Sequence, residues 1–252
     1  MGQIPAEQKT RLKDHLPNHS GLEGEAILDN FLTWVSEQGL VPYPAQEEAL
    51  LEVMTGRHVI LSTPTGSGKS LVAQGLHFKA MCEGRRSFYT APIKALVSEK
   101  FFELCQHFGA ENVGMVTGDA SLNREAPIIC CTAEILSNMA VVRGEDADAP
   151  YVVMDEFHYY GDRNRGMAWQ IPLIQLPSTQ FLLMSATLGD TSEIERQIKS
   201  RTGKSVSRVH SEDRPVPLDF RFAEVPILES AEALLKEKKS PIYIVHFTQR
   251  AA

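Results

Sequence analysis

The most distinctive run of residues in this sequence is Thr63-Pro64-Thr65-Gly66-Ser67-Gly68-Lys69-Ser70. Glycines allow the backbone to fold around an anion, so that several N–H groups point inward at it. The run follows the apolar segment 59–62 and precedes a segment of helical length, whose N-terminus would add further free N–H groups. Lys69 would reach the β- and γ-phosphates of a nucleotide, and the hydroxyl of Ser70 would coordinate Mg²⁺. The run therefore predicts a nucleotide-binding loop, although the general pattern has glycine where this chain has Thr63.

Two acidic residues, Asp155 and Glu156, follow the apolar run 151–154. Parallel strands deliver the residues at their carboxyl ends to one edge of the sheet, where open α/β sheets bind ligands. Asp155 would hold Mg²⁺ through its water shell, and Glu156 would orient or deprotonate an attacking water molecule. An isolated acidic pair is more often a solvated loop. Beside the nucleotide-binding loop, however, Lys69, Asp155 and Glu156 become the candidate catalytic set.

A third run, Ser185-Ala186-Thr187, also stands at the end of an apolar segment. Small hydroxyl residues in this position are more often turn formers than functional groups. This run therefore predicts a function only in combination with the two preceding motifs.

Alternating strands and helices must bring these loops together. Short runs rich in β-branched, aromatic and aliphatic residues predict strands at 59–62, 87–91, 113–117, 128–132, 151–155 and 181–185. Their nearly continuous apolar character is typical of parallel strands covered on both faces. Segments of helical length lie between or after them, at 69–82, 94–107, 133–142, 166–176 and 192–202. The alternation predicts an α/β fold in which helices flank a mostly parallel sheet.

The N-terminal part contains two more predicted helices. Apolar residues recur at helical spacing within 23–38, and a second helix is expected to begin after Pro44. Residues 1–22 are mostly polar, and we expect them to be loosely ordered.

Composition limits the possible partners. The chain has 252 residues, and its 25 Lys and Arg residues against 32 Asp and Glu residues leave a net charge of −7. No sequence-wide basic surface is therefore available, and a polyanionic partner would have to bind in a local groove. The four cysteines form no C-x-x-C pair, which favours buried, reduced thiols. Apolar runs are too short to span a bilayer, and the N-terminus lacks an apolar signal region, so we expect a cytoplasmic protein with no membrane partner.

Taken in order, the motifs resemble those of a superfamily 2 DExH-box helicase. They are the nucleotide-binding loop, Ala91-Pro92-Ile93-Lys94-Ala95-Leu96, Thr117-Gly118-Asp119, Thr132-Ala133-Glu134-Ile135-Leu136, Asp155-Glu156-Phe157-His158 and Ser185-Ala186-Thr187. The Asp-Glu-x-His box and Arg214-Pro215-Val216-Pro217-Leu218 make the chain most similar to the Ski2-like branch. The resemblance extends from about residue 42 to the end of the chain.

This resemblance implies ATP as the nucleotide, with Mg²⁺, and nucleic acid as the partner. Gln46 would recognise the adenine edge, and His158 would couple the nucleotide to Ser185 and Thr187. Contacts with the nucleic-acid backbone would come from Pro92, Lys94, Leu96, Thr117, Gly118 and Thr132. Small and hydroxyl residues at strand–helix junctions can present N–H and O–H donors to phosphates, and such neutral donors suit an acidic protein. Glu134 would support that loop rather than touch phosphate.

The resemblance also implies a division into domains. Residues 23–213 would form the ATP-binding, RecA-like domain, and residues 214–252 would be the truncated start of a second RecA-like domain. In that second part we expect a strand at 218–225, a helix at 228–238 and a strand at 242–247. The remaining helicase C-terminal domain, which supplies arginines to the ATP site in this superfamily, would be missing. The chain alone is therefore expected to bind nucleotide but to be nearly inactive as an ATPase.

The predicted function is that of an ATP-dependent helicase that translocates on and unwinds nucleic acid, with RNA favoured over DNA by analogy alone. One alternative is a superfamily 2 DNA translocase or restriction-type motor subunit, which a nuclease or methylase module elsewhere in the protein would indicate. Another is an ATP-gated nucleic-acid clamp without unwinding. Intact Lys69, Asp155 and Glu156 argue against a motor that has lost its chemistry.

Overall fold

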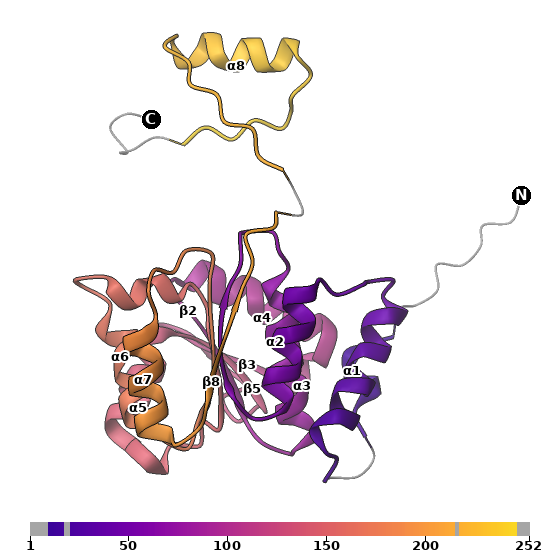
Figure 1. Cartoon of the computed structure of the whole chain (residues 1–252), viewed down its shortest axis with the longest axis vertical. Helices are drawn as coiled ribbons and strands as arrows, with labels where there is room; N and C mark the ends of the chain where they lie inside the picture. The colour runs from indigo at the N-terminus through magenta and orange to yellow at the C-terminus, as the bar shows by residue number, and fades with distance from the viewer. Residues whose placement is uncertain (1–9, 18–20, 215–216, 246–252) are drawn as a thin grey trace, which may run out of the picture. The chain divides into compact units, whose positions relative to one another are not determined.

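The computed structural model describes residues 10–17, 21–214 and 217–245. Contacts between Cα atoms divide the chain into two units, Met1–Pro215 and Val216–Ala252. The first unit is a layered α/β structure in which helices cover both faces of one sheet (Figure 1).

The sheet contains eight strands within the described residues, in the order β4-β3-β5-β2-β6-β7-β1-β8. The strands are β1 (His58–Ser62), β2 (Ser87–Ala91), β3 (Val113–Val116), β4 (Ser121–Leu122), β5 (Ile128–Thr132), β6 (Tyr151–Met154), β7 (Gln180–Ser185) and β8 (Val206–His210). Neighbouring strands are parallel except for β3 and β4, which are antiparallel. The predicted fold class, a mostly parallel sheet flanked by helices, is therefore confirmed.

Helices α1 to α4 lie on one face of the sheet and α5 to α7 on the other (Figure 1). Their bounds are α1 (Gly24–Glu37), α2 (Pro44–Met54), α3 (Lys69–Cys82), α4 (Lys94–Phe108), α5 (Ala133–Arg143), α6 (Met167–Gln175) and α7 (Ser192–Thr202). Successive strand residues point to opposite faces, so Val153 of β6 joins the core under α1 to α4, whereas Val152 joins the core under α5 to α7. Both faces of the central strands are thus buried, as their apolar sequences predict.

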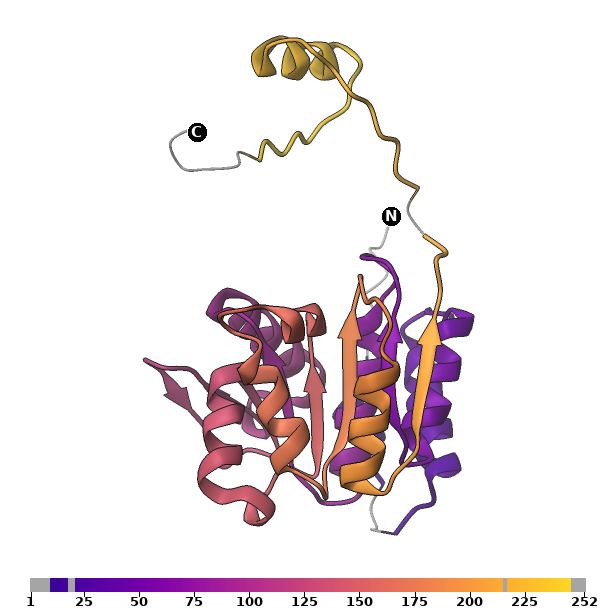
Figure 2. The ribbon, with the colours of Figure 1, turned by 60° about the vertical axis from the view of Figure 1, so that its left-hand side comes forward.

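The register of the central strands brings the predicted site to one edge. Met154 pairs with Leu183 across β6 and β7, and Ser185 pairs with Ser62 across β7 and β1. The loops that follow β6, β7 and β1 therefore begin side by side. The long strands point in the same direction, with their carboxyl ends at one edge of the sheet (Figure 2).

Two strands and one turn were not predicted. β4 has only two residues, both exposed, and β8 mixes polar and apolar residues at the edge of the sheet, so neither produces an apolar run. Residues 10–17, expected to be loosely ordered, contain the 3₁₀ turn Leu12–His15, and Leu12 is fully buried. Residues 1–9 lie outside the described part. No helix in the described ranges is long and apolar enough to cross a membrane.

The second unit contains helix α8 (Ile227–Lys236), close to the predicted helix. The predicted strand at 218–225 is not formed, nor is strand formed at 242–245, while residues 246 and 247 lie outside the described residues. The proline motif at 214–218 is also only partly described, because residues 215 and 216 fall outside. A strand requires a neighbour to pair its backbone groups, and nothing described in this unit supplies one. Phe220 and Phe222 are 88% and 89% exposed, so the apolar side chains here lack a core.

Candidate nucleotide and nucleic-acid site

The predicted nucleotide-binding loop connects β1 to α3. Gly66 and Gly68 have φ angles of +85° and +71°, in the left-handed region that favours glycine, and Gly68 is the residue immediately before α3. The hydroxyl groups of Thr63 and Ser67 lie 2.6 Å apart, which closes the loop from the inside. The glycines in the predicted motif therefore perform the backbone turn for which their spacing is typical.

Lys69 is the first residue of α3, and its side chain turns back into the loop. Its Nζ donates to the carbonyl oxygens of Thr63 and Pro64, at 2.8 and 3.1 Å. Burial lowers the pKa of Lys69, an effect that the charges of Asp155 and Glu156 oppose. The ammonium group of Lys69 thus donates to neutral carbonyl oxygens. An anionic phosphate would accept stronger, charge-assisted hydrogen bonds from it.

Gln46, on the first turn of α2, fastens the nucleotide-binding loop. Its Nε2 donates to the carbonyl oxygens of Ser67 and Gly68 at 3.0 and 2.8 Å, and its Oε1 accepts from the backbone N–H of Tyr43 at 2.8 Å. Gln46 is buried, and it lines a cavity of about 370 Å³ together with Tyr43, Thr63 and Lys69. Its predicted contact with adenine remains a prediction, since both ends of its amide group already have protein partners.

Asp155 and Glu156 follow β6 directly. Glu156 has a φ of +49°, which is uncommon for a residue with a side chain and marks a locally strained turn of the kind that clusters at functional sites. Its backbone N–H donates to Oδ1 of Asp155 at 2.9 Å. The other oxygen, Oδ2, accepts a hydrogen bond from the hydroxyl of Tyr89 on β2. The sequence alone does not indicate Tyr89, because this residue stands inside an apolar strand and belongs to no motif.

The oxygen atoms of Ser70 and Asp155 fit the preferences of Mg²⁺. A hydroxyl and a carboxylate are hard oxygen ligands, and Mg²⁺ in nucleotide sites is held by one or two protein oxygens, phosphates and water. Within the described residues no group of three or more His, Cys, Asp or Glu side chains could hold a metal by itself. The oxygens of Ser70 and Asp155 therefore suit a metal ion whose other ligands are phosphates and water.

His158 joins the acidic loop to the predicted Ser-Ala-Thr motif. Its Nδ1 lies 3.2 Å from Oε2 of Glu156 and 3.3 Å from Oγ of Ser185. The Ser185 hydroxyl in turn accepts the backbone N–H of Thr187 at 3.2 Å. The structure thus brings together all three residues predicted to couple the nucleotide to motion, next to the predicted catalytic Glu156.

The residues predicted to contact the nucleic-acid backbone lie at the ends of β2, β3 and β5 or directly after them, and these strands are neighbours in the sheet. Ala91 of β2 pairs with Thr132 of β5, so the segments that lead into α4 and α5 leave the sheet side by side. Lys94 forms an ion pair with Asp119 at 2.6 Å, and the Thr117 hydroxyl donates to the same carboxylate oxygen at 2.9 Å.

The remaining predicted contacts differ in exposure. Gly118 has open space where a Cβ would lie, so a backbone could approach it closely. Pro92 is buried, but its carbonyl oxygen accepts a hydrogen bond from Arg165. Leu96 is partly buried against the core, so less of its side chain is available than at the exposed Lys94.

Arg165, which no motif in the sequence indicates, connects two of these loops. Besides its hydrogen bond to Pro92, its guanidinium group donates to Oε1 of Glu134, with Nε at 3.1 Å and a second nitrogen at 2.6 Å. The same group lies over the rings of Tyr159 and Trp169, 5.6 and 5.8 Å from their centroids. Glu134 therefore supports the loop through Arg165, in agreement with the supporting position expected for it.

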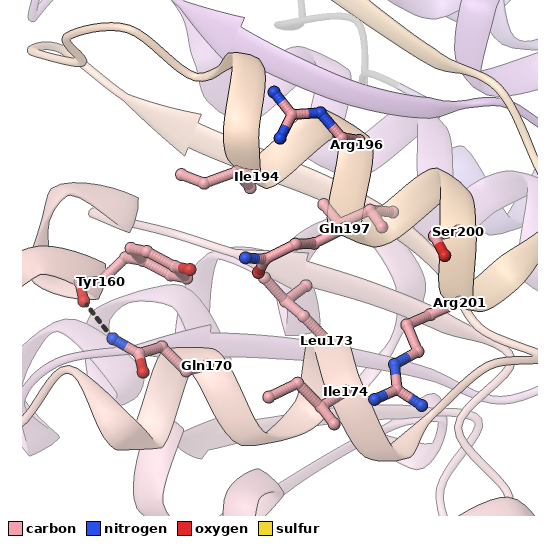
Figure 3. A pocket seen from close by; sticks show the side chains of 10 residues that line it. Tyr160, Gln170, Leu173, Ile174, Ile194, Arg196, Gln197, Ser200 and Arg201 are labelled. Atoms are coloured by element: carbon pink, nitrogen blue, oxygen red, sulfur yellow. Dashed lines mark hydrogen bonds between the residues drawn. The ribbon is translucent and has the colours of Figure 1, made fainter.

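A second cavity, of about 600 Å³, lies away from these residues, between α6 and α7 (Figure 3). Tyr160, Leu173 and Arg201 are among the side chains that line it, and the carbonyl oxygen of Tyr160 accepts a hydrogen bond from Gln170 at 3.0 Å. None of the predicted site residues lines it. The cavity beside the nucleotide-binding loop is therefore smaller than this second cavity, and cavity volume alone would not identify the candidate site.

Comparison with known proteins places the site in context. The DEAD/DEAH box helicase family matches residues 43–195, more than half of the chain. Over 211 residues the chain is 36% identical to a protein of Arabidopsis thaliana named DExH-box ATP-dependent RNA helicase DExH15, chloroplastic. This alignment covers 79% of this chain and 18% of the Arabidopsis protein. It is 35% identical over 196 residues to the antiviral helicase SKI2 of Saccharomyces cerevisiae, covering 73% and 15% of the two chains. The chain thus spans less than a fifth of the length of these curated relatives.

Two solved structures have a similar fold. The helicase domain of Hef from Pyrococcus furiosus aligns with a TM-score of 0.54 and 22% identity, over 78% of this chain and 45% of that one. A hypothetical ATP-dependent RNA helicase from Sulfolobus tokodaii aligns with a TM-score of 0.55 and 19% identity, over 71% of this chain and 56% of that one. At these identities the likeness concerns the fold.

Proposed function

Because the chain belongs to the DEAD/DEAH box helicase family, we propose that it is the ATP-binding half of an ATP-dependent nucleic-acid helicase. The resemblance to DExH-box helicases of the Ski2-like branch is confirmed by the same relatives. The proposed activity is hydrolysis of ATP coupled to movement along a nucleic-acid strand and to unwinding.

One observation carries this proposal. The nucleotide-binding loop follows β1, the Asp155–Glu156 pair follows β6, and Ser185 ends β7. These three strands lie next to one another with their carboxyl ends at one edge of the sheet. Lys69 is close enough to Asp155 and Glu156 for their charges to act on its pKa. The arrangement therefore supports a site in which Lys69 would bind phosphate, Asp155 would bind metal and Glu156 would act as the base, which are the parts that phosphoryl transfer needs.

In the proposed mechanism Lys69 leaves the carbonyl oxygens of Thr63 and Pro64 and binds the β- and γ-phosphates of ATP. Ser70 and Asp155 would hold Mg²⁺, which neutralises charge on the phosphates. Glu156 orients the attacking water and receives its proton. His158, within hydrogen-bonding distance of both Glu156 and Ser185, transmits the change in charge at the site to the loop after β7.

The nucleic-acid partner is proposed to run across the loops that follow β2, β3 and β5. Its phosphates would be bound by neutral N–H and O–H donors of these loops and by Lys94, which is the one charged residue among the predicted contacts. Such a site is compatible with a chain of net charge −7. RNA is favoured over DNA, since an Arabidopsis relative that covers 79% of this chain is named an RNA helicase. A cytoplasmic location belongs to the same proposal, and the four free thiols are compatible with a reducing compartment.

We further propose that residues 23–213 form the first RecA-like domain and residues 214–252 the start of a second. The exposed apolar side chains around α8 support this division, because they need a covering partner. Tested by themselves, the 252 residues should bind nucleotide but hydrolyse it slowly, since an arginine finger is worth about 10³–10⁵ in rate.

Equilibrium binding of a fluorescent, non-hydrolysable ATP analogue to the 252-residue chain tests the nucleotide site. Lys69→Ala should weaken binding by about tenfold or more, whereas Lys199→Ala, on the exposed surface of α7, should leave it unchanged. Equal affinities for the wild type and Lys69→Ala would refute the proposed site.

Hydrolysis is tested in a protein that joins this chain to a complete second RecA-like domain. Glu156→Gln there should retain ATP binding and abolish phosphate release, because the amide cannot accept a proton. Strand displacement by the wild type distinguishes a helicase from an ATP-gated clamp, which would bind RNA more tightly with ATP without separating strands. Stimulation of ATPase by DNA but not RNA would favour the translocase alternative.

A further inference from the structure

Lys100 on α4 reaches the candidate nucleotide site from the side. Its Nζ donates to Oγ of Ser70 on α3 at 2.8 Å and to Oε2 of Glu103, one turn further along α4, at 2.6 Å. The side chains of Lys100 and Glu103 are only 16% and 26% exposed. Gln74 of α3 donates to the other carboxylate oxygen of Glu103 at 3.1 Å. Lys100 is therefore held in place by groups from two helices.

The hydrogen bond from Lys100 ends on the hydroxyl group assigned above to Mg²⁺. An ammonium group and a divalent cation that both contact one hydroxyl oxygen are a few ångströms apart, and in a partly buried site their repulsion is only weakly screened. One hydrogen bond to a hydroxyl cannot offset that repulsion. The Ser70 hydroxyl can therefore serve Lys100 or a metal ion, but not both.

We propose that Lys100 is a positioning residue that competes with Mg²⁺ for the hydroxyl of Ser70. Lys100 either donates to the hydroxyl of Ser70, as in the structure, or, when Ser70 turns to the metal, remains paired with Glu103 alone. Because Glu103 already contacts Lys100 at 2.6 Å, Lys100 can give up Ser70 without moving into water as an unpaired charge. This inference rests on the proposed Mg²⁺–nucleotide site and names a residue that regulates it.

Lys100 lies on α4, the helix that also carries two of the residues predicted to contact nucleic acid. α4 begins at Lys94, and Lys94 and Leu96 are among the predicted contacts with the nucleic-acid backbone. Six residues of helix, or about 9 Å, separate Lys94 from Lys100. When Ser70 exchanges Lys100 for the metal, α4 therefore loses a hydrogen bond to α3. The first turn of α4 carries predicted contacts with the nucleic acid, so the exchange links the two proposed sites.

The test compares nucleotide affinity with and without metal. The measured quantity is the ratio of the Kd of a fluorescent ATP analogue in EDTA to its Kd in Mg²⁺, for the 252-residue chain. Lys100→Met removes the competing cation and keeps the length of the side chain, so this ratio should rise by about threefold or more. Lys100→Arg retains the cation and should stay near the wild-type ratio. Lys13→Met removes another lysine–glutamate ion pair, in which Lys13 Nζ lies 2.7 Å from Oε1 of Glu111, and should leave the Kd ratio unchanged.

Two further variants separate competition from other effects. Lys100→Met leaves Glu103 unpaired, and this negative charge could itself attract Mg²⁺, so Lys100→Met/Glu103→Gln removes both charges and should still exceed the wild-type ratio. In a Ser70→Ala background Lys100→Met should have no effect on the ratio, because the shared hydroxyl is gone.

The proposal is overturned if Lys100→Met leaves the ratio unchanged or lowers it, if the double variant returns to the wild-type value, or if the effect persists without the Ser70 hydroxyl. A failure of the proposed nucleotide site gives a different result, since the wild type itself would then bind the analogue no better with Mg²⁺ than without. Circular dichroism of each variant verifies that the fold is retained.

Discussion

The hydroxyl group of Tyr89, on β2, donates a hydrogen bond to the carboxylate of Asp155, the residue that follows β6. The two strands are paired, and the backbone N–H of Asp155 donates to the carbonyl oxygen of Thr90 at 2.9 Å. Burial raises the pKa of Tyr89 well above its usual value, and the charge of Asp155 raises it further, so the hydroxyl keeps its proton. Tyr89 is therefore a fixed donor that orients the carboxylate proposed to bind metal.

Replacement of Tyr89 by phenylalanine removes this donor and little else. We expect Tyr89→Phe to weaken Mg²⁺-dependent nucleotide binding by about fivefold, or about 1 kcal/mol, because Asp155 loses one of the two hydrogen bonds that aim its oxygens. Binding of the fluorescent ATP analogue measures the change, with Tyr160→Phe as a control whose hydroxyl lies outside the site. Unchanged affinity in Tyr89→Phe would mean that the backbone N–H of Glu156 suffices to orient Asp155.

The two loop glycines should respond differently to alanine. Both have positive φ angles, so either substitution should cost about 1–2 kcal/mol of stability. A Cβ at Gly68 would also lie 2.4 Å from Nε2 of Gln46, whereas at Gly66 it would meet nothing within 4 Å. Gly68→Ala should therefore weaken nucleotide binding more than Gly66→Ala. In a Gln46→Ala background, which lacks the clashing amide, Gly68→Ala should cost less affinity than it does in the wild type, whereas the cost of Gly66→Ala should be the same in both backgrounds. An unchanged cost for Gly68→Ala would contradict the clash.

The nucleotide-binding loop and the acidic pair could be predicted because their chemistry is local in sequence. Gly66 and Gly68 provide the turn by themselves, and the apolar run before Asp155 places it at the end of a strand. The parallel sheet then brings both loops to one edge, which the alternation of strands and helices already indicated.

The supporting residues could not be predicted, because their partners are far away in the sequence. Tyr89 and Asp155 are 66 positions apart, and Arg165 and the carbonyl oxygen of Pro92 are 73 positions apart. Neither Tyr89 nor Arg165 belongs to a spaced motif, and only the packing of β2 on β6 and of the loop before α6 on β2 brings them to the site. Likewise, no periodicity in the sequence indicates that Lys100 reaches Ser70 on the neighbouring helix.

Arg165 should matter for nucleic-acid binding more than for nucleotide binding. It joins the loop after β2 to the first turn of α5 through Pro92 and Glu134, and both segments carry predicted backbone contacts. Arg165→Gln should therefore reduce affinity for single-stranded RNA by roughly tenfold, or about 1.4 kcal/mol, with little change in nucleotide affinity. Arg163→Gln, two positions away and exposed, is the matched control for loss of charge. Fluorescence anisotropy with labelled RNA measures both, and equal losses would indicate a general electrostatic effect instead.

Buried histidines should make the fold sensitive to acid. His58 accepts the backbone N–H of Phe181 at Nδ1, at 3.1 Å, and its Nε2 lies 2.8 Å from the hydroxyl of Thr202, so the neutral ring is fully used. Burial, and to a lesser extent the charge of Lys204, lowers the pKa of His58 to about 4. Burial alone lowers the pKa of His77 to about 3. Both rings therefore stay neutral in the folded chain at a pH where an unfolded chain would protonate them.

The sign of the pH effect follows from this difference in pKa. As the pH falls below about 6.5, the unfolded chain takes up a proton at His58 that the folded chain does not accept until about pH 4, so stability declines across this window. Between pH 7 and pH 5, His58 alone should contribute a loss of about 2 kcal/mol in the free energy of unfolding. Urea denaturation at the two pH values measures it, and His58→Gln should reduce the loss by about that amount, whereas His210→Gln, at an exposed position, should leave it unchanged. His58 is expected to stay neutral in the folded chain because a protonated ring could not accept the Phe181 N–H. The same pH dependence in His58→Gln and the wild type would contradict this expectation.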